Sequence, residues 1–316
     1  MSNHQPQRIA VIDLGSNTNR LIVMNTIPGF VYFLEDEVRE VVRLRQGMTA
    51  RGLSDEAMNR GFSTLRLYKD FCQQTNVNKI LAVATSAVRE AANGPAFLSK
   101  VKKEIGLDFQ ILDGEKEAYY DTLGALNEVQ LTEGTVLDIG GGSIQLSDVQ
   151  KRRFEKGASL TLGALALTED FVRHDPITDA EYLAIEQEIK KQLATIPWLK
   201  DKRGQTLVGL GGTIRNLASI EAKRQNYPLF TLHGFTLTKD SVIQSINEFR
   251  TLPLEKRKNI SGLNDDRADI ILPGAMVLKL VMDFLDIDEL QLSINGLREG
   301  VFLELFWSHL DPPIIP

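Results

Sequence analysis

Residues 135–143 read TVLDIGGGS, an apolar run that ends at Asp138 and is followed by three consecutive glycines. The short run of β-branched and aliphatic residues predicts a buried strand, with Asp138 at its end. Three glycines in a row carry a large backbone entropy cost, and a plain hairpin turn needs only one or two of them. We therefore expect residues 140–143 to form a loop that holds an anion.

The same order of features occurs near the N-terminus, where residues 9–12 form a β-branched run that ends at Asp13. The turn that Gly15 opens brings successive amides together with the hydroxyls of Ser16 and Thr18, an arrangement that favours anion binding. Asp13 stands where a carboxylate can hold a hydrated cation that bridges to phosphate. A plain hairpin turn is the alternative interpretation of this loop.

A third glycine motif, GLGGT at residues 209–213, follows another apolar run. A strand that leads into glycines and then into a helix points amides and the positive end of the helix dipole toward negative charge. Close packing between strand and helix is the alternative explanation of these glycines.

The chain has 316 residues, which favours two domains of about 150 residues each. Its two halves open alike, with an apolar strand, an aspartate, a turn rich in Gly and Ser, and a second strand. This pattern predicts an α/β fold of two similar domains that meet at a cleft, with the boundary between residues 126 and 134. A further helix should begin at Gly211. The other expected strands are residues 21–24, 31–33, 80–84, 110–112, 144–149, 153–156, 206–210 and 290–293, and the other expected helices are residues 54–75, 85–92, 115–126, 163–173, 179–193, 240–249, 269–285 and 298–306.

The composition is that of a globular protein, with 43% hydrophobic and 25% charged residues and a net charge of −6. General nucleic-acid binding is not expected, because it usually requires a basic face. The polar N-terminus contains no secretory signal, and no run of about 18 apolar residues predicts a membrane span. The cytoplasm is therefore the expected location.

Cys72 is the single cysteine, so neither an internal disulfide nor a cysteine-rich zinc site is expected. The four histidines His4, His174, His233 and His309 are too scattered to predict a metal cage. The one basic run, residues 151–153, should be a solvated hairpin turn. The apolar set Leu278, Leu280, Val281, Phe284 and Leu285 predicts core or a dimer face.

In combination the glycine motifs resemble those of the sugar kinase, actin and heat-shock chaperone superfamily. The whole chain more closely resembles the exopolyphosphatase / guanosine pentaphosphate phosphatase family. The matching segments, in the order of that family, are residues 11–20, 84–91, 114–118, 138–143, 209–213, 232–234, 266–269 and 296–300.

The resemblance implies two ribonuclease-H-like domains of the actin-like ATPase type, with an active site in the cleft between them. The domains are expected at residues 1–128 and 129–296, with the last helix, about 297–316, returning to the first. The resemblance also implies Mg²⁺ as cofactor, with a monovalent cation such as K⁺ as an option, and a homodimer.

Particular residues take roles from this resemblance. Glu117 matches the catalytic glutamate that activates water, Arg89 matches a phosphate-contacting residue, and Asp138 matches a metal-binding residue. From the residues alone, a solvated acid at a helix start is the favoured interpretation of Glu117, and Arg89 can pair with Glu90 or Glu117. His233, Arg267 and Arg298 are candidates for a substrate channel or an interdomain contact, or for a purely structural role. The predicted catalytic residues are Glu117 and Arg89; the predicted phosphate-binding residues are Asp13, Gly15, Ser16, Asn17, Thr18, Arg20, Gly140, Gly141, Gly142, Ser143, Gly211, Gly212, Thr213 and Arg267; and the predicted metal ligands are Asp138, Asp13 and Gln145.

Two departures from the family pattern stand out. The family reads Ser–Thr–Glu after the second loop, whereas this chain has Ser143, Ile144 and Gln145, so a neutral amide replaces a carboxylate. The chain also lacks the C-terminal helical extensions of longer members, which puts processivity on long polymers in question. Strand alternation places Ser143 and Gln145 on one side of the strand. Gln145 is then either a weak magnesium ligand or a hydrogen-bond partner of the neighbouring strand.

The sequence therefore predicts an enzyme that hydrolyses the terminal phosphoanhydride bonds of inorganic polyphosphate and releases orthophosphate. Hydrolysis of guanosine pentaphosphate by the same chemistry is the first alternative, because phosphate recognition would be shared. A low-turnover sensor of polyphosphate or of a guanosine alarmone is the second alternative, and Gln145 is its support. No sugar-binding signature favours a kinase.

Overall fold

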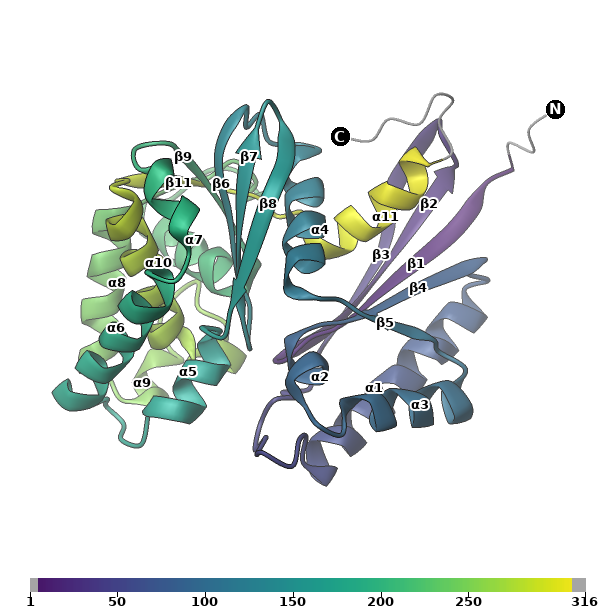
Figure 1. Ribbon diagram of the computed structural model, residues 1–316, viewed down its shortest axis with the longest axis horizontal. Helices are drawn as coiled ribbons and strands as arrows, with labels where there is room; N and C mark the ends of the chain where they lie inside the picture. Colours follow the sequence, from purple (N-terminus) through teal and green to yellow (C-terminus); the bar gives the residue numbers. More distant parts are fainter. Residues whose placement is uncertain (1–4, 309–316) are drawn as a thin grey trace. The chain divides into compact units, whose positions relative to one another are not determined.

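The computed structural model describes residues 5–308, which form two compact units. Unit 1 contains residues 5–124 and 297–308, and unit 2 contains residues 125–296. Each unit is built on one β-sheet, as the alternating strand and helix pattern predicts (Figure 1). The expected α/β class with two sheets is thereby confirmed.

The sheet of unit 1 has five strands in the order β3-β2-β1-β4-β5. The first three form an antiparallel meander, and β4 and β5 continue the sheet in parallel with β1. The strands are β1 (Gln7–Leu14), β2 (Thr18–Ile27), β3 (Val31–Val41), β4 (Lys79–Ala84) and β5 (Phe109–Ile111). The helices are α1 (Asp55–Gln74), α2 (Ser86–Glu90), α3 (Gly94–Ile105), α4 (Gly114–Leu126) and α11 (Leu297–Trp307).

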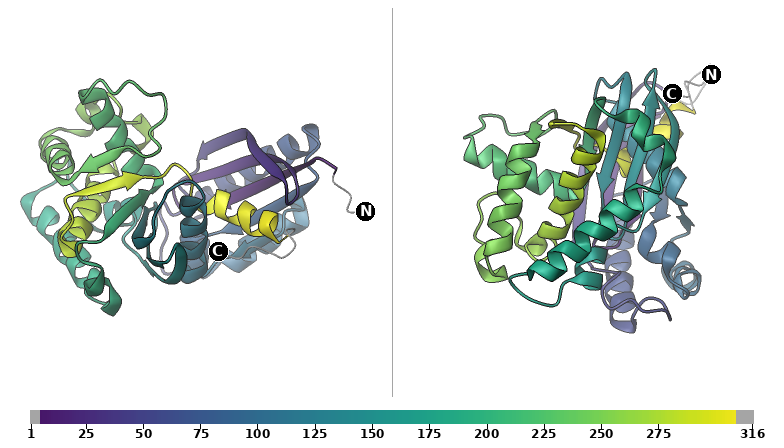
Figure 2. Two further views of the ribbon diagram at one scale, coloured as in Figure 1. Left: turned by 90° about the horizontal axis from the view of Figure 1, so that it is seen from above. Right: turned by 60° about the vertical axis from the view of Figure 1, so that its left-hand side comes forward.

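Strand β1 is the centre of unit 1 and is buried on both faces. Ile12 and Leu14 belong to the apolar cluster on the side of α1 and α3, whereas Val11 belongs to the cluster on the side of α4 and α11. A continuous apolar run is what a strand covered on both faces requires. The last helix, α11, lies beside β1 although almost the whole chain separates them (Figures 1 and 2).

The sheet of unit 2 has six strands in the order β10-β11-β9-β6-β7-β8. Its apolar core is largest around α10, which packs against α5, α6, α7 and α8. The strands are β6 (Glu133–Ile139), β7 (Ile144–Gln150), β8 (Arg153–Leu160), β9 (Thr206–Leu210), β10 (Thr236–Thr238) and β11 (Glu289–Leu292). The helical segments are α5 (Ala164–Phe171), α6 (Asp179–Leu193), η1 (Pro197–Lys202), α7 (Gly211–Arg224), α8 (Lys239–Thr251), α9 (Leu254–Arg257), η2 (Asp265–Arg267) and α10 (Ile271–Leu285).

Most expected elements are present, and the sequence analysis missed the helices α3 and α9, the short turns η1 and η2 and the strand β10. Helix α6 has the expected bounds, and Ser54 caps α1 by accepting a hydrogen bond from the amide of Ala57. The sequence analysis assigned no element to residues 94–105, and Gly–Pro is a pair that can mark a loop. Pro95 instead stands in the first turn, where its missing N–H costs nothing.

The basic run and the apolar set have structural roles. Arg152 is exposed, as expected for a solvated turn, and it also donates hydrogen bonds to the carbonyls of Leu126 (2.7 Å) and Val129 (3.4 Å). Its side chain therefore satisfies carbonyls at the end of α4. Leu278, Val281 and the rest of the apolar set lie in the core of unit 2 or pack against it.

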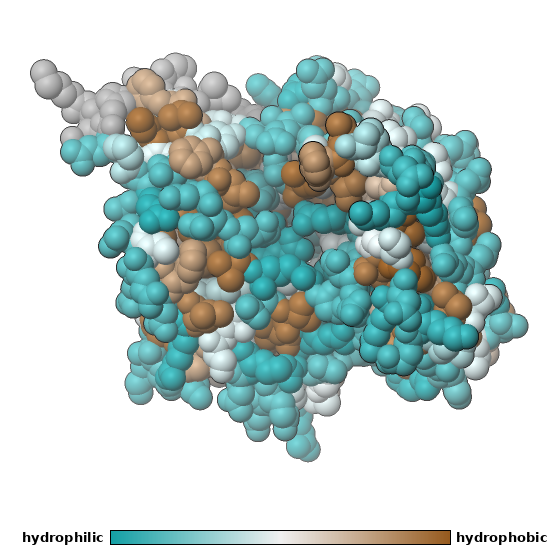
Figure 3. Space-filling view, turned by 180° about the vertical axis from the view of Figure 1, so that it is seen from behind, coloured by the Kyte–Doolittle hydropathy of each residue, from teal (hydrophilic) through white to brown (hydrophobic). Residues whose placement is uncertain are grey.

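Surface apolar groups are few. Hydrophilic side chains dominate the face shown in Figure 3, and apolar ones form small separate groups. Phe30, Val31, Phe33 and Leu34 are exposed at the hairpin between β2 and β3. No helix within residues 5–308 has the length and apolar character that a membrane span needs. His4 and His309 lie outside the described residues, and the homodimer stays a prediction.

Candidate functional site

The first glycine loop joins β1 to β2 in unit 1. Its carbonyls accept hydrogen bonds from the segment after β3. The carbonyl of Ser16 accepts one from the amide of Arg45 (3.0 Å), and the carbonyl of Asn17 accepts two from backbone amides of the same segment. The amides of Gly15, Ser16 and Asn17 donate to no backbone acceptor among the described residues. Three successive amides without a backbone acceptor are what the predicted anion-binding loop would need, and anion binding here stays a prediction. Gly15 is required, because a Cβ there would lie 2.6 Å from the carbonyl oxygen of Thr18.

The second glycine loop joins β6 to β7 in unit 2 and repeats this arrangement. The carbonyls of Gly140 and Gly141 accept hydrogen bonds from amides at the start of α5, at 2.9–3.0 Å. The amides of Gly141, Gly142 and Ser143 donate to no backbone acceptor in the part of the chain that the structure describes. A second set of three amides is therefore available to an anion.

The start of α7 lies against the second loop, as expected for the third glycine motif. A Cβ on Gly211 would overlap the carboxylate of Asp138, and a Cβ on Gly212 would overlap the guanidinium of Arg267. Gly211 has a φ of +89°, a conformation that favours glycine. Unit 2 thus brings together Asp138, the second loop, the helix start with Thr213 and an arginine that is only 5% exposed.

Glu117 and Arg89 form an ion pair in unit 1. Glu117 stands in the first turn of α4 and is 7% exposed. Arg89, on α2, donates from Nη1 to Glu117 Oε2 at 2.7 Å and to the carbonyl of Leu112 at 2.9 Å. Of the two partners considered for Arg89, Glu117 is the one observed, and Glu90 pairs with Arg45 instead at 2.6 Å. The carboxylate is therefore held in place by a charge-assisted hydrogen bond.

Helix α4 is anchored to α11 one turn beyond Glu117. Lys116 forms an ion pair with Glu304 at 2.6 Å, and the hydroxyl of Tyr120 donates to the same carboxylate at 2.7 Å. Burial and the bond to Glu304 raise the pKa of Tyr120, so its hydroxyl remains a donor at any physiological pH. These contacts restrict the direction in which Glu117 projects.

Ser16 links the first loop to the helix that carries Arg89. Its Oγ lies 2.7 Å from Ser86 Oγ and accepts a hydrogen bond from the amide of Ala87 at 3.1 Å. Thr85, the residue before α2, makes no capping hydrogen bond with its side chain. Ser16, in the loop between β1 and β2, supplies the cap instead. We expected this hydroxyl to face the anion, but the structure directs it at α2, where it is 4% exposed.

Asp13, Arg20 and Arg298 belong to one charged group in unit 1. Asp13 and Arg20 are cross-strand neighbours on β1 and β2. Arg298, on α11, donates to Glu37 Oε1 at 2.8 Å, and Arg20 lies 4.0 Å from the same oxygen. Arg298 is thus a buried link between α11 and β3, which is the structural role that the sequence analysis kept open.

Gln145 lies directly opposite Asp138 in the pairing of β6 and β7. Its Nε2 donates to Ser143 Oγ at 2.8 Å and to Ser159 Oγ, on β8, at 3.0 Å. Its Oε1 is buried with no hydrogen-bond partner among the described residues. The amide therefore bonds to the neighbouring strand, as one expectation held, and still presents an unsatisfied oxygen on the face of Asp138.

The donor set fits a magnesium ion better than a transition metal. Within residues 5–308 no group of three or more His, Cys, Asp or Glu side chains comes together. Magnesium needs only one or two carboxylates, since it keeps several waters and binds substrate phosphates. Asp138 with the unsatisfied oxygen of Gln145 meets that requirement in unit 2.

Two buried polar residues, one in each unit, were missed by the sequence analysis. Arg45, 7% exposed, pairs with Glu90 at the end of α2. Asn216, 3% exposed, lies in the second turn of α7 and bonds to the segment before Arg267. A polar residue on the buried face of an amphipathic helix was the available signal for Asn216.

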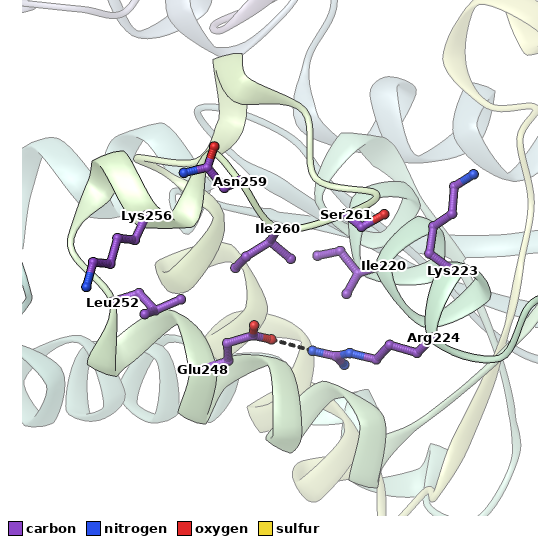
Figure 4. A pocket seen from close by; sticks show the side chains of 9 residues that line it. All are labelled: Ile220, Lys223, Arg224, Glu248, Leu252, Lys256, Asn259, Ile260 and Ser261. Carbon is purple, nitrogen blue, oxygen red and sulfur yellow. Dashed lines mark hydrogen bonds and ion pairs between the residues drawn. The ribbon is translucent and has the colours of Figure 1, made fainter.

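A separate pocket of about 520 Å³ lies at the opposite end of α7 (Figure 4). Arg224 and Glu248 point toward one another across it and pair at 2.5 Å, whereas Lys223 and Lys256 project away from its apolar floor. Basic residues in the last turn of a helix also offset its dipole. Ion pairing and the helix end therefore explain the basic residues of this pocket. The pocket does not extend the glycine-loop region.

Comparison with known proteins identifies the kind of protein that carries these loops. Residues 22–309 match the family described as the Ppx/GppA phosphatase family. The chain belongs to the Ppx/GppA phosphatase family. The sequence-based assignment is confirmed, and the chain is accordingly a hydrolase.

Relatives of known name match nearly the full length. Exopolyphosphatase 1 of Mycobacterium tuberculosis is 28% identical over 309 residues, which cover 96% of this chain and 90% of the relative. The crystal structure of the Ppx/GppA family member of Aquifex aeolicus is 30% identical, with a TM-score of 0.78 over 95% of this chain and 97% of that chain. An exopolyphosphatase structure from Cytophaga hutchinsonii, 24% identical, shares the fold with a TM-score of 0.88 over 95% and 98% of the two chains.

Proposed function

We propose that this protein hydrolyses the terminal phosphoanhydride bond of inorganic polyphosphate and releases orthophosphate. The observation that carries the proposal is the pair of glycine loops, each with three successive amides that lack a backbone acceptor among the described residues. Loops of this kind suit a substrate that is made of phosphate groups. The names of the similar proteins support the same substrate class.

In the proposed reaction the chain supplies position, charge and a base. The loop amides and Arg267 hold phosphate oxygens by charge-assisted hydrogen bonds. Glu117 accepts a proton from the attacking water, and its bond to Arg89 sets the direction of the carboxylate. Phosphoryl transfer depends mainly on such positioning and on neutralisation of the phosphate oxygens.

Magnesium is part of the proposal as the cofactor that neutralises phosphate charge when bound. Asp138 and Gln145 would hold it in unit 2, and Asp13 remains a proposed ligand in unit 1. The Asp138 carboxylate carries the charge, and the unsatisfied Oε1 of Gln145 gains a partner.

Guanosine pentaphosphate is the second proposed substrate, because the family includes phosphatases of that kind and the same loops would bind its phosphates. A low-turnover sensor is a weaker reading, since Glu117 remains in place and is oriented by Arg89.

Phosphate release from polyphosphate, guanosine pentaphosphate and ATP, measured side by side with Mg²⁺ and then with EDTA, tests the proposal. We expect the largest kcat/KM with polyphosphate and little release once the metal is chelated. A larger kcat/KM with guanosine pentaphosphate would select the second substrate. Binding without turnover of any of the three would select the sensor.

A further inference from the structure

Arg267 is held over the start of a helix to which it does not belong. It ends the short turn η2, whereas the glycines that it covers open α7, and 54 residues (267 − 213) separate Arg267 from Thr213 in the sequence. Arginine has several rotatable bonds and loses much rotamer entropy when it is fixed. Something must therefore hold η2 against α7 for the guanidinium to stay at Gly212.

Asn216 makes the connection with both ends of its amide. Its Nδ2 donates to the carbonyl of Gly212 at 2.8 Å, and its Oδ1 accepts from the amide of Asn264, also at 2.8 Å. The amide of Arg267 in turn donates to the carbonyl of Asn264 at 2.9 Å. A continuous set of hydrogen bonds thus runs from the glycine under the guanidinium, through Asn216, to the backbone of Arg267.

The surroundings of Asn216 favour one orientation of this amide. The residue is 3% exposed, and its donor and its acceptor face different backbone partners. A flipped amide would place its NH₂ group against the amide of Asn264 and its oxygen against the carbonyl of Gly212, and neither pair can form a hydrogen bond. Gly262, just before this segment, approaches α7 so closely that a Cβ would lie 2.6 Å from the carbonyl oxygen of Ser219. The backbone contact brings the segment near α7, and Asn216 sets its register.

We propose that Asn216 is a positioning residue that holds Arg267 over the first turn of α7, in the place where Arg267 binds a phosphate oxygen of the substrate. The inference rests on the proposed function in one respect, that Arg267 contacts phosphate. Asn216 itself touches no substrate. Its effect on the reaction passes through Arg267 alone.

A double-mutant cycle on kcat/KM for polyphosphate separates this role from a general structural one. We expect Arg267→Ala and Asn216→Ala each to lower kcat/KM by about 10- to 100-fold, since a misplacement of about 1 Å can cost 10²-fold. The double variant should equal Arg267→Ala within about 2-fold, because Asn216 has nothing left to position. Effects that multiply, or wild-type kcat/KM in Asn216→Ala, would overturn the proposal.

A second variant breaks the same link from its other side. Asn264 has a φ of −76°, which suits proline. Asn264→Pro therefore removes the backbone N–H that donates to Asn216 Oδ1. It should lower kcat/KM as Asn216→Ala does and should add nothing to that variant. Additive losses would count against the proposal even if Asn216→Ala proved poorly folded.

The matched control is Ser245→Ala on α8, which removes another hydrogen bond of α7, the part-buried bond from Arg224 Nη1 to Ser245 Oγ at 3.0 Å. It should lower Tm by as much as Asn216→Ala while it leaves kcat/KM unchanged. An equal loss of kcat/KM in the control would show that any weakening of α7 suffices, and the proposal would fall. Wild-type kcat/KM in Arg267→Ala would instead remove the phosphate role of Arg267, and with it the need for positioning.

Discussion

The glycine loops of the two units share a backbone arrangement and differ in what is attached to it. In both, a strand ends in aspartate, the loop carbonyls accept bonds from a neighbouring segment, and three amides lack a backbone acceptor among residues 5–308. In unit 1 the loop connects through Ser16 to α2 and the Arg89–Glu117 pair. In unit 2 the strand end before the loop meets the start of α7, and Arg267 covers that helix start. One loop arrangement is thus combined with a buried carboxylate in one unit and with a buried arginine in the other.

The largest effect should come from the base of unit 1. Glu117→Gln should lower kcat by ~10²–10⁴-fold, since an amide keeps the shape but cannot accept a proton from water. Substrate affinity, measured by equilibrium binding, should stay nearly unchanged. Glu115→Gln is the matched control, because it removes an exposed carboxylate from the same helix turn. A Glu117→Gln variant that keeps more than about a tenth of the rate would remove Glu117 from the mechanism.

A glycine-to-alanine substitution in each unit, Gly15→Ala and Gly212→Ala, should distinguish the surroundings of the two glycines. Gly15→Ala places Cβ against the backbone carbonyl of Thr18, which cannot move aside, so we expect lower activity and a Tm lower by several degrees. Gly212→Ala meets the far end of Arg267, which can move, and alanine favours a helix by about 1 kcal/mol over glycine. Its activity should fall while its Tm changes little. Kinetics with thermal melts of both variants will check this, and equal Tm losses would contradict the difference.

The metal requirement of unit 2 should respond to Gln145. Gln145→Glu adds a charged oxygen opposite Asp138, so half-maximal rate should need less Mg²⁺, by about 3- to 10-fold, since magnesium prefers charged oxygen ligands. The added charge should also slow turnover, because it repels phosphate. Magnesium titrations decide the point, with Gln150→Glu, at the exposed end of the same strand, as control. Coincident activation curves for Gln145→Glu and wild type would reject a metal role.

The smallest expected effect is on the thermal stability of unit 2 and comes from Glu181, in the capping box of α6. Hydrogen bonds from the Thr178 amide, and then from His174 and the Thr178 hydroxyl, lower the pKa of Glu181 to about 2 in the capping box of α6. A lowered folded-state pKa stabilises the fold above the ordinary value of 4.5, and this contribution is lost as pH falls toward 2. Glu181→Gln should therefore lower Tm slightly at pH 7 and by less at pH 3.

The rate at which the thiol of Cys72 is labelled measures the opening of unit 1 in the same variant. The thiol is 2% exposed, and burial raises its pKa to about 11, so thiol reagents should modify it only when unit 1 opens. Its labelling rate at pH 7 should be equal in wild type and Glu181→Gln. Faster labelling in the variant would show that the two units do not open independently.

The sequence identified the loops because their requirement is local. A glycine is needed where a side chain would meet the carbonyl two or three residues on, and an aspartate at a strand end is visible as a break in an apolar run. The same locality explains the correct bounds of α6, which a capping box begins. Helix α3 was missed, and Gly94 and Pro95 permit a helix start as readily as a break.

The partners of the site residues depended on tertiary structure. Nothing in the sequence indicates that Ser16 caps α2, that Arg298 reaches Glu37 across 261 residues, or that Asn216 holds the segment before Arg267. Such pairings follow from strand order and helix packing, which bring together residues with no fixed spacing along the chain. The sequence by itself therefore predicted which residues carry the chemistry, whereas the packing of the elements decided which of them contact one another.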